Sequence, residues 1–551
     1  MKKYPLQAAS RHGIDCTNIG ICEPLTKLLQ LRNSMFILIT SLILFIAAIA
    51  LLVLRAARPA FRSAWLIAAG SALAAWLMIF FWQLQMPIAF ELPSWQPADL
   101  FADAPAFLAD RLSWPLALSI ATLTLGTLLT AVVRENFPNS MTWAGMLMLG
   151  GISLWAVTAS NPLTLVLVWA AIDLAELITQ LRSVDSPQAG ERVVVAFSTR
   201  IIGISLLLWA NVVGVNAGAR LEFLYMPPQA GIYLIAAAGL RLGVLPLHLP
   251  YGSESAIRRG FGTMLRLSSA ISSLVLLARV PAEATNSPAT IFLLILSAIA
   301  AVYGGWMWLR APDELSGRPF WMIGTAALAV SAALQSNPLG AIAWGCALIL
   351  AGGALFLVSV QDRTLSRVLL VGLWGLSALP LSLTASAWIN RAAWIWPFLI
   401  AAQVMLAAGW VRHALRPGAR GNYQSHPIWA RGIYSAGIGL FLFTELLLGW
   451  YGWDGALILG AWPFGIAASL LTLGLVWAIP RIQTLNPGRA HWVRPFGGSR
   501  LDKLYGSLWE LYHQFGRLTD AITTMLEGSS GIMWALLFLA IFVSLITQGT
   551  P

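Results

Sequence analysis

Residues 241–279 read RLGVLPLHLPYGSESAIRRGFGTMLRLSSAISSLVLLAR, and this stretch decides the fold class. An apolar segment ends near Pro246, a polar loop with Arg258 and Arg259 follows, and a second apolar segment covers residues 262–280. A helix that spans a bilayer needs roughly 20 mostly apolar residues. A proline inside such a helix removes a backbone donor and opens it. The stretch therefore predicts two membrane helices, the first of them broken near Pro246.

The same apolar pattern fills the rest of the chain. Hydrophobic residues make up 58% of the 551 positions, charged residues only 10%, and the mean hydropathy is +0.74. This composition excludes a soluble domain and predicts an all-α membrane protein. We expect about sixteen transmembrane helices, at residues 35–55, 64–83, 114–133, 141–159, 162–182, 193–213, 229–248, 262–280, 288–309, 319–335, 338–359, 367–388, 393–412, 432–451, 456–479 and 531–547.

The charges indicate an orientation in the cytoplasmic (inner) membrane. Loops that follow odd-numbered spans are basic, as around Arg55, Arg258 and Arg412, and short cytoplasmic loops retain Lys and Arg. Both termini are then expected on the non-cytoplasmic side. The net charge of +11 comes from dispersed arginines, so topology explains it and no nucleic-acid partner is expected. The basic N-terminal tail departs from this pattern, and we hypothesise that translation starts at Met35, which N-terminal sequencing of the native protein would test.

Ionisable residues at membrane depth are the candidate functional residues, because each is unfavourable there. Asp173 and Glu176 are three residues apart in the span 162–182 and so share one helix face. The other candidates for an ion or proton path lie in or next to later spans: Arg200, Arg241, His248, Arg266 and Arg391. Pro246 and Pro380 predict helix breaks, and paired broken helices are typical of transporters built on inverted repeats. No catalytic, cofactor-binding or metal site is predicted, because the sequence has no Gly-rich phosphate loop, zinc-ligand spacing or hydrolase motif. Cys16, Cys22 and Cys346 are too few and too scattered for an iron–sulfur cluster.

These stretches resemble the antiporter-like membrane subunits of respiratory complex I (NADH:quinone oxidoreductase), Mrp Na⁺/H⁺ antiporters and membrane-bound hydrogenases. In residues 241–279, Pro246-Leu247-His248 matches the family motif and Arg279 closes the following helix. AFSTRIIGISLLL at residues 196–208 is similar to the sixth helix of the terminal complex I subunit type, and ALPLSLTASAW at residues 378–388 resembles its broken twelfth helix. The resemblance implies a proton- or cation-translocating subunit with other membrane subunits as partners.

The resemblance also implies a division of the chain. The expected parts are an N-terminal tail (1–33), two accessory transmembrane helices with an acidic external loop (34–113), an antiporter-like core (114–480), a cytoplasmic-side amphipathic segment (481–530) and a last transmembrane helix (531–551). In the amphipathic segment, Leu504, Leu508 and Leu511 follow helical spacing, which predicts a short lateral helix on the membrane surface. In the resembling subunits such a helix braces neighbouring subunits.

The departures from the family bear on mechanism. Arg241 stands where the family has its central lysine, Ala170 where it has a buried glutamate, and Ala387 where its broken twelfth helix carries a Lys or Glu. The chain has no lysine between Lys27 and Lys503. A buried lysine can release its proton, whereas arginine stays charged. The family's lysine relay therefore cannot operate here as written, although Asp173 could supply the missing carboxylate.

Three functions remain open from the sequence. The first is a working proton or cation path in a larger complex, with electrons and quinone handled by other chains and no active site here. The second is a degenerate scaffold subunit that keeps the fold for assembly. The third is an unrelated polytopic carrier or membrane enzyme. Solute transport by the purified chain alone would favour the third.

Structural roles are expected beside the functional ones. Glu176 could be a rim residue paired with Arg182, and Arg200 could form a structural ion pair with Asp173. His248 could cap carbonyls of the broken helix. For Glu445, in the span 432–451, we expect a hydrogen bond between helices.

Overall fold

The structure is a computed structural model, and it describes the backbone of residues 22–58, 63–92, 104–134, 137–183, 187–219, 222–251, 259–388, 393–416 and 421–485. The chain divides into two compact units, residues 1–481 and 482–551. Three predictions fall outside the described residues: the lateral segment, the last span at 531–547, and the position of Arg391.

Each predicted span up to residue 479 contains at least one helix. The α-helices are α1 (Cys22–Ala57), α2 (Ala64–Trp82), α3 (Trp114–Leu129), α4 (Ser140–Thr158), α5 (Pro162–Leu181), α6 (Pro187–Asn216), α7 (Pro228–Arg241), α8 (Phe261–Ala278), α9 (Ala289–Arg310), α10 (Glu314–Leu334), α11 (Pro338–Leu357), α12 (Arg363–Leu369), α13 (Trp396–Ala414), α14 (Ile428–Trp450) and α15 (Trp462–Leu485). Ten of the described helices are long and apolar enough to cross a membrane. The chain is an integral, multi-pass membrane protein.

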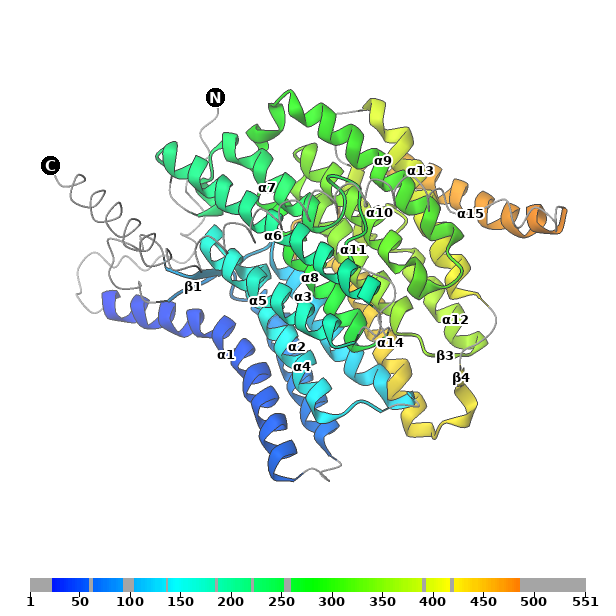
Figure 1. The fold of residues 1–551 in the computed structure, drawn as a ribbon, viewed down its shortest axis with the longest axis horizontal. Coiled ribbons are helices and arrows are strands. Elements are labelled where there is room, and N and C mark those ends of the chain that lie inside the picture. Colours follow the sequence, from blue (N-terminus) through cyan, green and yellow to red (C-terminus); the bar gives the residue numbers. More distant parts are fainter. Residues whose placement is uncertain are drawn as a thin grey trace, which may run out of the picture. The chain divides into compact units, whose positions relative to one another are not determined.

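The most buried helices of the first unit are α3, α8, α10 and α11. The apolar windows of α3, α8 and α11 are 89%, 94% and 94% buried, whereas those of α1 and α6 are 39% and 33% buried. The outer helices turn large apolar side chains outward, such as Ile46 at 61% exposure and Leu66 at 61%. Such a surface is stable against lipid but not against water. Figure 1 shows α5, α6, α7 and α8 close together on one side of this bundle.

The predicted acidic loop between α2 and α3 contains a short hairpin. Strand β1 (Ile88–Glu91) pairs antiparallel with β2 (Ala106–Ala109). Asp110, directly after β2, accepts hydrogen bonds of 2.6 and 3.0 Å from the guanidinium of Arg279 at the end of α8. This loop is therefore tied to the helix bundle by a bidentate ion pair.

Basic residues predicted in cytoplasmic loops also satisfy helix ends. Arg259 donates to the carbonyls of Phe356 and Val358 at the end of α11 and pairs with Glu314 at 2.5 Å. Arg412 donates to carbonyls at the end of α9 in the same way. The last carbonyls of a helix lack partners within the helix, and a cation there also complements the helix dipole. Arg259 and Arg412 therefore have a structural role at helix ends.

Two predicted spans are not continuous helices. The span 229–248 is helical only to Arg241, and Gly243 then adopts a φ of 75° in the turn that follows. A Cβ atom at this glycine would press against the carbonyl oxygen of His248, so the tight turn needs glycine. The span 367–388 contains α12, a 3₁₀ turn η4 (Leu370–Leu373), an irregular segment 374–382 and a second 3₁₀ turn η5 (Leu383–Trp388).

Candidate functional site

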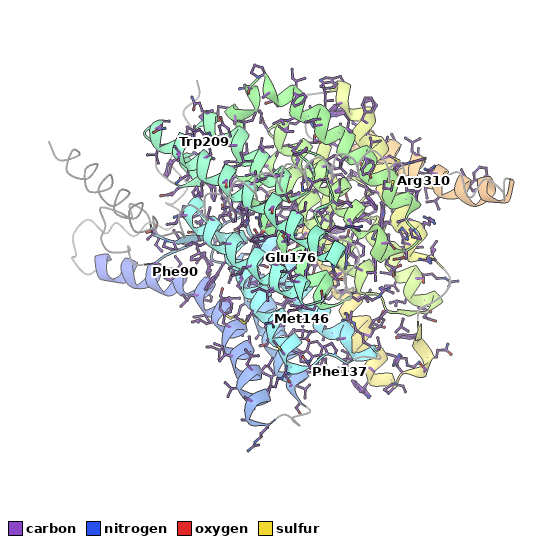
Figure 2. All side chains as sticks on the ribbon, viewed as in Figure 1. Phe90, Phe137, Met146, Glu176, Trp209 and Arg310 are labelled. Carbon is purple, nitrogen blue, oxygen red and sulfur yellow. The ribbon has the colours of Figure 1, made fainter. Side chains whose placement is uncertain are left out.

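One face of α5 carries the candidate site. Trp169, Asp173 and Glu176 follow one another at four- and three-residue steps, so they form one stripe on the helix. All three are buried, with Asp173 at 0% and Glu176 at 2% exposure. Figure 2 labels Glu176, which is buried against α6. Asn161 caps the N-terminus of α5 by accepting a 2.8 Å hydrogen bond from the backbone N–H of Thr164, as its position before Pro162 favours.

Asp173 forms a bidentate ion pair with Arg241, the last residue of α7. The two terminal nitrogens of Arg241 donate to the two carboxylate oxygens of Asp173 at 2.5 and 2.8 Å. The guanidinium lies 4.1 Å from the ring centroid of Trp169, and its Nε donates to the hydroxyl of Ser273 at 3.2 Å. Each donor and acceptor of this pair thus has a matched partner, as a buried charge requires.

Glu176 forms a second bidentate pair, with Arg200 of α6. Nη1 of Arg200 donates to Oε2 of Glu176. Nη2 of Arg200 donates to Oε1 at 2.9 Å. Gln180, one turn further along α5, donates to the same Oε1 at 2.5 Å. Arg200 also lies 3.8 Å from a carboxylate oxygen of Asp173. Asp173 is therefore next to both arginines, and the two ion pairs form one network.

A glycine on α6, Gly203, leaves space for the side chain of Arg241. A Cβ atom at Gly203 would lie 2.6 Å from Cγ of Arg241. Gly203 follows Arg200 by three residues, so both face α7. The aliphatic part of Arg241 therefore packs directly on the backbone of α6.

The network extends into the broken segment after α7. Arg200 donates to the carbonyl of Pro250 at 3.2 Å, and the next residue, Tyr251, packs its ring 4.8 Å from the guanidinium carbon of Arg266. Arg266 is 2% exposed and donates to the carbonyl of Gly262 at 3.0 Å. A row of charged groups thus runs from the end of α7 through α5 and α6 to α8.

The structure brings together four of the predicted site residues, Asp173, Glu176, Arg200 and Arg241. Arg266 lies beside them, and His248 lies in the adjoining turn, where its Nδ1 is 2.8 Å from the carbonyl oxygen of Pro246. Pro380 lies in the other broken segment, and Arg391 falls outside the described residues.

Two structural expectations are corrected. Glu176 is not a rim residue paired with Arg182, because it is buried and bound by Arg200. The expected ion pair of Arg200 with Asp173 is present at 3.8 Å, beside the closer pair of Arg200 with Glu176. Among the described residues, no group hydrogen-bonds to the carboxylate of Glu445, so the expected bond between helices is not formed. Sequence reasoning also missed Trp169 as a partner of the arginine, although its position four residues before Asp173 was a usable signal.

The chemistry available here is proton exchange on carboxylates under the influence of fixed positive charges. Two carboxylates and two guanidiniums balance, so the network is neutral when all four groups are ionised. The guanidiniums do not release protons under physiological conditions. Within the described residues, no three His, Cys, Asp or Glu side chains come together as metal ligands.

Comparisons with known proteins identify the fold. No family model and no curated protein matches the sequence. A chain of the Mrp complex from Dietzia sp. DQ12-45-1b has a TM-score of 0.67 at 13% identity, over 94% of this chain and 63% of that chain. This protein thus spans less than two thirds of that subunit.

For two further solved structures, the match extends over almost the whole length of the matched chain. A chain of the archaeal membrane-bound sulfane sulfur reductase, a respiratory membrane complex, matches with a TM-score of 0.61 at 13% identity, over 92% of this chain and 99% of that one. A chain of respiratory complex I from Thermus thermophilus matches with a TM-score of 0.59 at 19% identity, over 79% and 99%. At these identities the likeness concerns the fold. It confirms that this chain has the fold of the antiporter-like membrane subunits that residues 241–279 resemble.

Proposed function

We propose that this chain is a proton- or cation-translocating subunit of a multisubunit membrane complex of the NADH:quinone oxidoreductase, Mrp or hydrogenase type. The observation that carries the proposal is the buried network of Asp173, Glu176, Arg200 and Arg241 beside the broken end of α7. Ionisable residues inside a membrane are energetically costly, so a buried network of them is a functional candidate by default. The fold likeness to chains of Mrp and respiratory complexes supports the same assignment.

The mechanism follows from the sharing of Asp173 between two arginines. A carboxylate that loses a neighbouring cation in a buried site takes up a proton more readily, because the opposite charge had favoured its ionised form. A movement of the segment after α7 would displace Arg241, which ends that helix, and would leave Asp173 with the more distant Arg200. Asp173 would then bind a proton and release it when Arg241 returns. A redox or ion-transporting partner subunit would drive this movement.

A scaffold subunit without conduction is the second candidate function. The bidentate geometry of both ion pairs favours it, because closely matched buried charges also stabilise a packed helix bundle. Arginine in place of the family lysine points the same way. An unrelated polytopic carrier is not supported, since the fold likeness extends over 94% of the chain.

Ion flux in vesicles that contain the native complex separates the two candidates. The variants are Asp173→Asn, Arg241→Ala and the double variant, in which the loss of one negative and one positive charge keeps the network balanced. Arg111→Ala is the matched control, because it removes an ion pair with Asp454 whose side chains are 71% and 47% exposed. If the double variant assembles but loses flux, the conducting function is supported. Unchanged flux with normal assembly would leave only the scaffold.

A further inference from the structure

The second broken segment covers a buried carboxyl group that the network does not use. Glu445 lies in α14 and is 1% exposed. A Cβ atom at Gly375 would overlap the carboxylate of Glu445, so the two are in direct contact. One turn further along α14, Gly449 packs against the backbone of Leu381 and Ser382. Segment 374–382 therefore lies along the face of α14 that carries Glu445.

Glu445 does not cap the broken segment. The hydroxyl of Thr384 donates to the carbonyl of Gly375 at 2.7 Å and accepts from the backbone N–H of Ala378 at 3.0 Å. Gln403 donates to the carbonyl of Leu376 at 2.8 Å. Other side chains thus satisfy the segment, while both oxygens of Glu445 lack a hydrogen-bond partner within the described part of the chain.

The elements packed against α14 bring few charges near this carboxyl group. They are α3, the 3₁₀ turn η1 (Thr130–Val133), α11, α12, η4 and η5. The titratable or charged residues in their sequences are Cys346 of α11 and Arg363 and Arg367 of α12. On α14 itself, Arg431 and Tyr434 precede Glu445 by about four and three helical turns. Among the described residues, Glu445 therefore has no arginine at its carboxylate, unlike Asp173 and Glu176.

An ionised carboxylate without a counterion is strongly unfavourable in a buried, apolar site, and such a group takes up a proton instead. We propose that Glu445 is a second proton-binding site of this protein, protonated while segment 374–382 is closed over it and deprotonated when that segment opens. The role of this site in transport rests on the proposed function, whereas the bound proton follows from the geometry around Glu445 alone.

A bound cation in place of the proton is the competing occupant. Cations such as Na⁺ or Ca²⁺ are held by several oxygen ligands, and negatively charged carboxylates usually provide part of them. Glu445 is the one carboxylate placed at this break among the described residues. A single carboxyl group matches a proton better than a metal ion.

Infrared difference spectroscopy on the native complex tests the bound proton. Subtracting the spectrum of Glu445→Gln from that of the wild type isolates the carboxyl group at neutral pH. We expect the carbonyl band of an un-ionised acid, shifted in D₂O, and the same band must persist in Glu176→Gln. Carboxylate bands in the difference spectrum would overturn the proposal. Conversion of the acid band to carboxylate bands on addition of Na⁺ would also overturn it, in favour of a cation site.

Proton flux in vesicles tests the role in transport separately. We expect the assembled Glu445→Gln complex to lose most of its flux, because glutamine cannot release a proton. Full flux together with the acid band would make Glu445 a fixed structural acid and would overturn its transport role, while the proposed path through Asp173 would stand. Loss of flux in the Asp173 variants alone would locate conduction in the first network only.

Discussion

The two broken segments accommodate ionisable side chains in opposite ways. At the first, after α7, Asp173 and Glu176 are each bound by an arginine in bidentate geometry. At the second, Glu445 is buried without a partner among the described residues. A carboxyl group inside a membrane protein is stable either as half of a matched ion pair or as a neutral acid. We therefore expect the stability of the first site to depend on its charges and the stability of the second on its packing.

The largest expected effect tests whether the first site depends on charge. Asp173→Asn leaves Arg241 buried without its carboxylate, and breaking a buried ion pair costs about 3–5 kcal/mol. We expect much less assembled complex and a lower thermal midpoint of the purified complex. Arg111→Ala, which breaks an exposed pair worth about 0–1 kcal/mol, is the control. Equal stability of the two variants would contradict the dependence of the first site on its charges.

A smaller effect is expected from Arg241→Lys. Lysine keeps a cation near Asp173 but cannot form the two parallel hydrogen bonds, and losing one hydrogen bond to a charged group costs about 1.5–3 kcal/mol. The variant also restores a residue that can exchange protons. We therefore expect reduced thermal stability together with retained ion flux in vesicles. Lost flux in a stably assembled variant would show that the path needs arginine specifically.

Packing at the second site is tested by Gly375→Ala. The added methyl group would collide with Glu445, and overpacking a well-packed core costs about 1–3 kcal/mol. Gly439→Ala on α14 is the matched control, because nothing lies within 4 Å of its Cβ position. Thermal midpoints of the two complexes should differ clearly. If they coincide, segment 374–382 does not press on Glu445 as the structure indicates.

The smallest effect is expected from Glu445→Gln. Glutamine is neutral and similar in size to a protonated glutamate, and the substitution breaks no ion pair with a described residue, so we expect the thermal midpoint to fall much less than in Asp173→Asn. A fall in the thermal midpoint as large as that of Asp173→Asn would contradict a neutral Glu445. Glu176→Gln, which breaks the pair with Arg200, is the matched positive control.

The sequence alone predicted the helices well and the charged partners only partly. Apolar length marked the spans, and Pro246 and Pro380 lie in the two non-helical segments, as expected for a residue that lacks the backbone N–H of a helix. Spacing along α5 also predicted that Asp173 and Glu176 face the same way. These features are local, so residue order is sufficient to predict them.

Which charged residues pair with one another depends on the packing of helices that are distant in the chain. Arg200 could have paired with either carboxylate, and the way α6 crosses α5 decided for Glu176. The sequence predicted a hydrogen bond between helices for Glu445, and only the tertiary structure showed its carboxyl group against Gly375 without a hydrogen-bond partner among the described residues. Hydrophobicity and proline act within one segment, and the sequence therefore determined the membrane fold and its breaks. Ion pairing and burial act between segments, and the tertiary structure therefore decided which charges are matched and which carboxyl group is left to bind a proton.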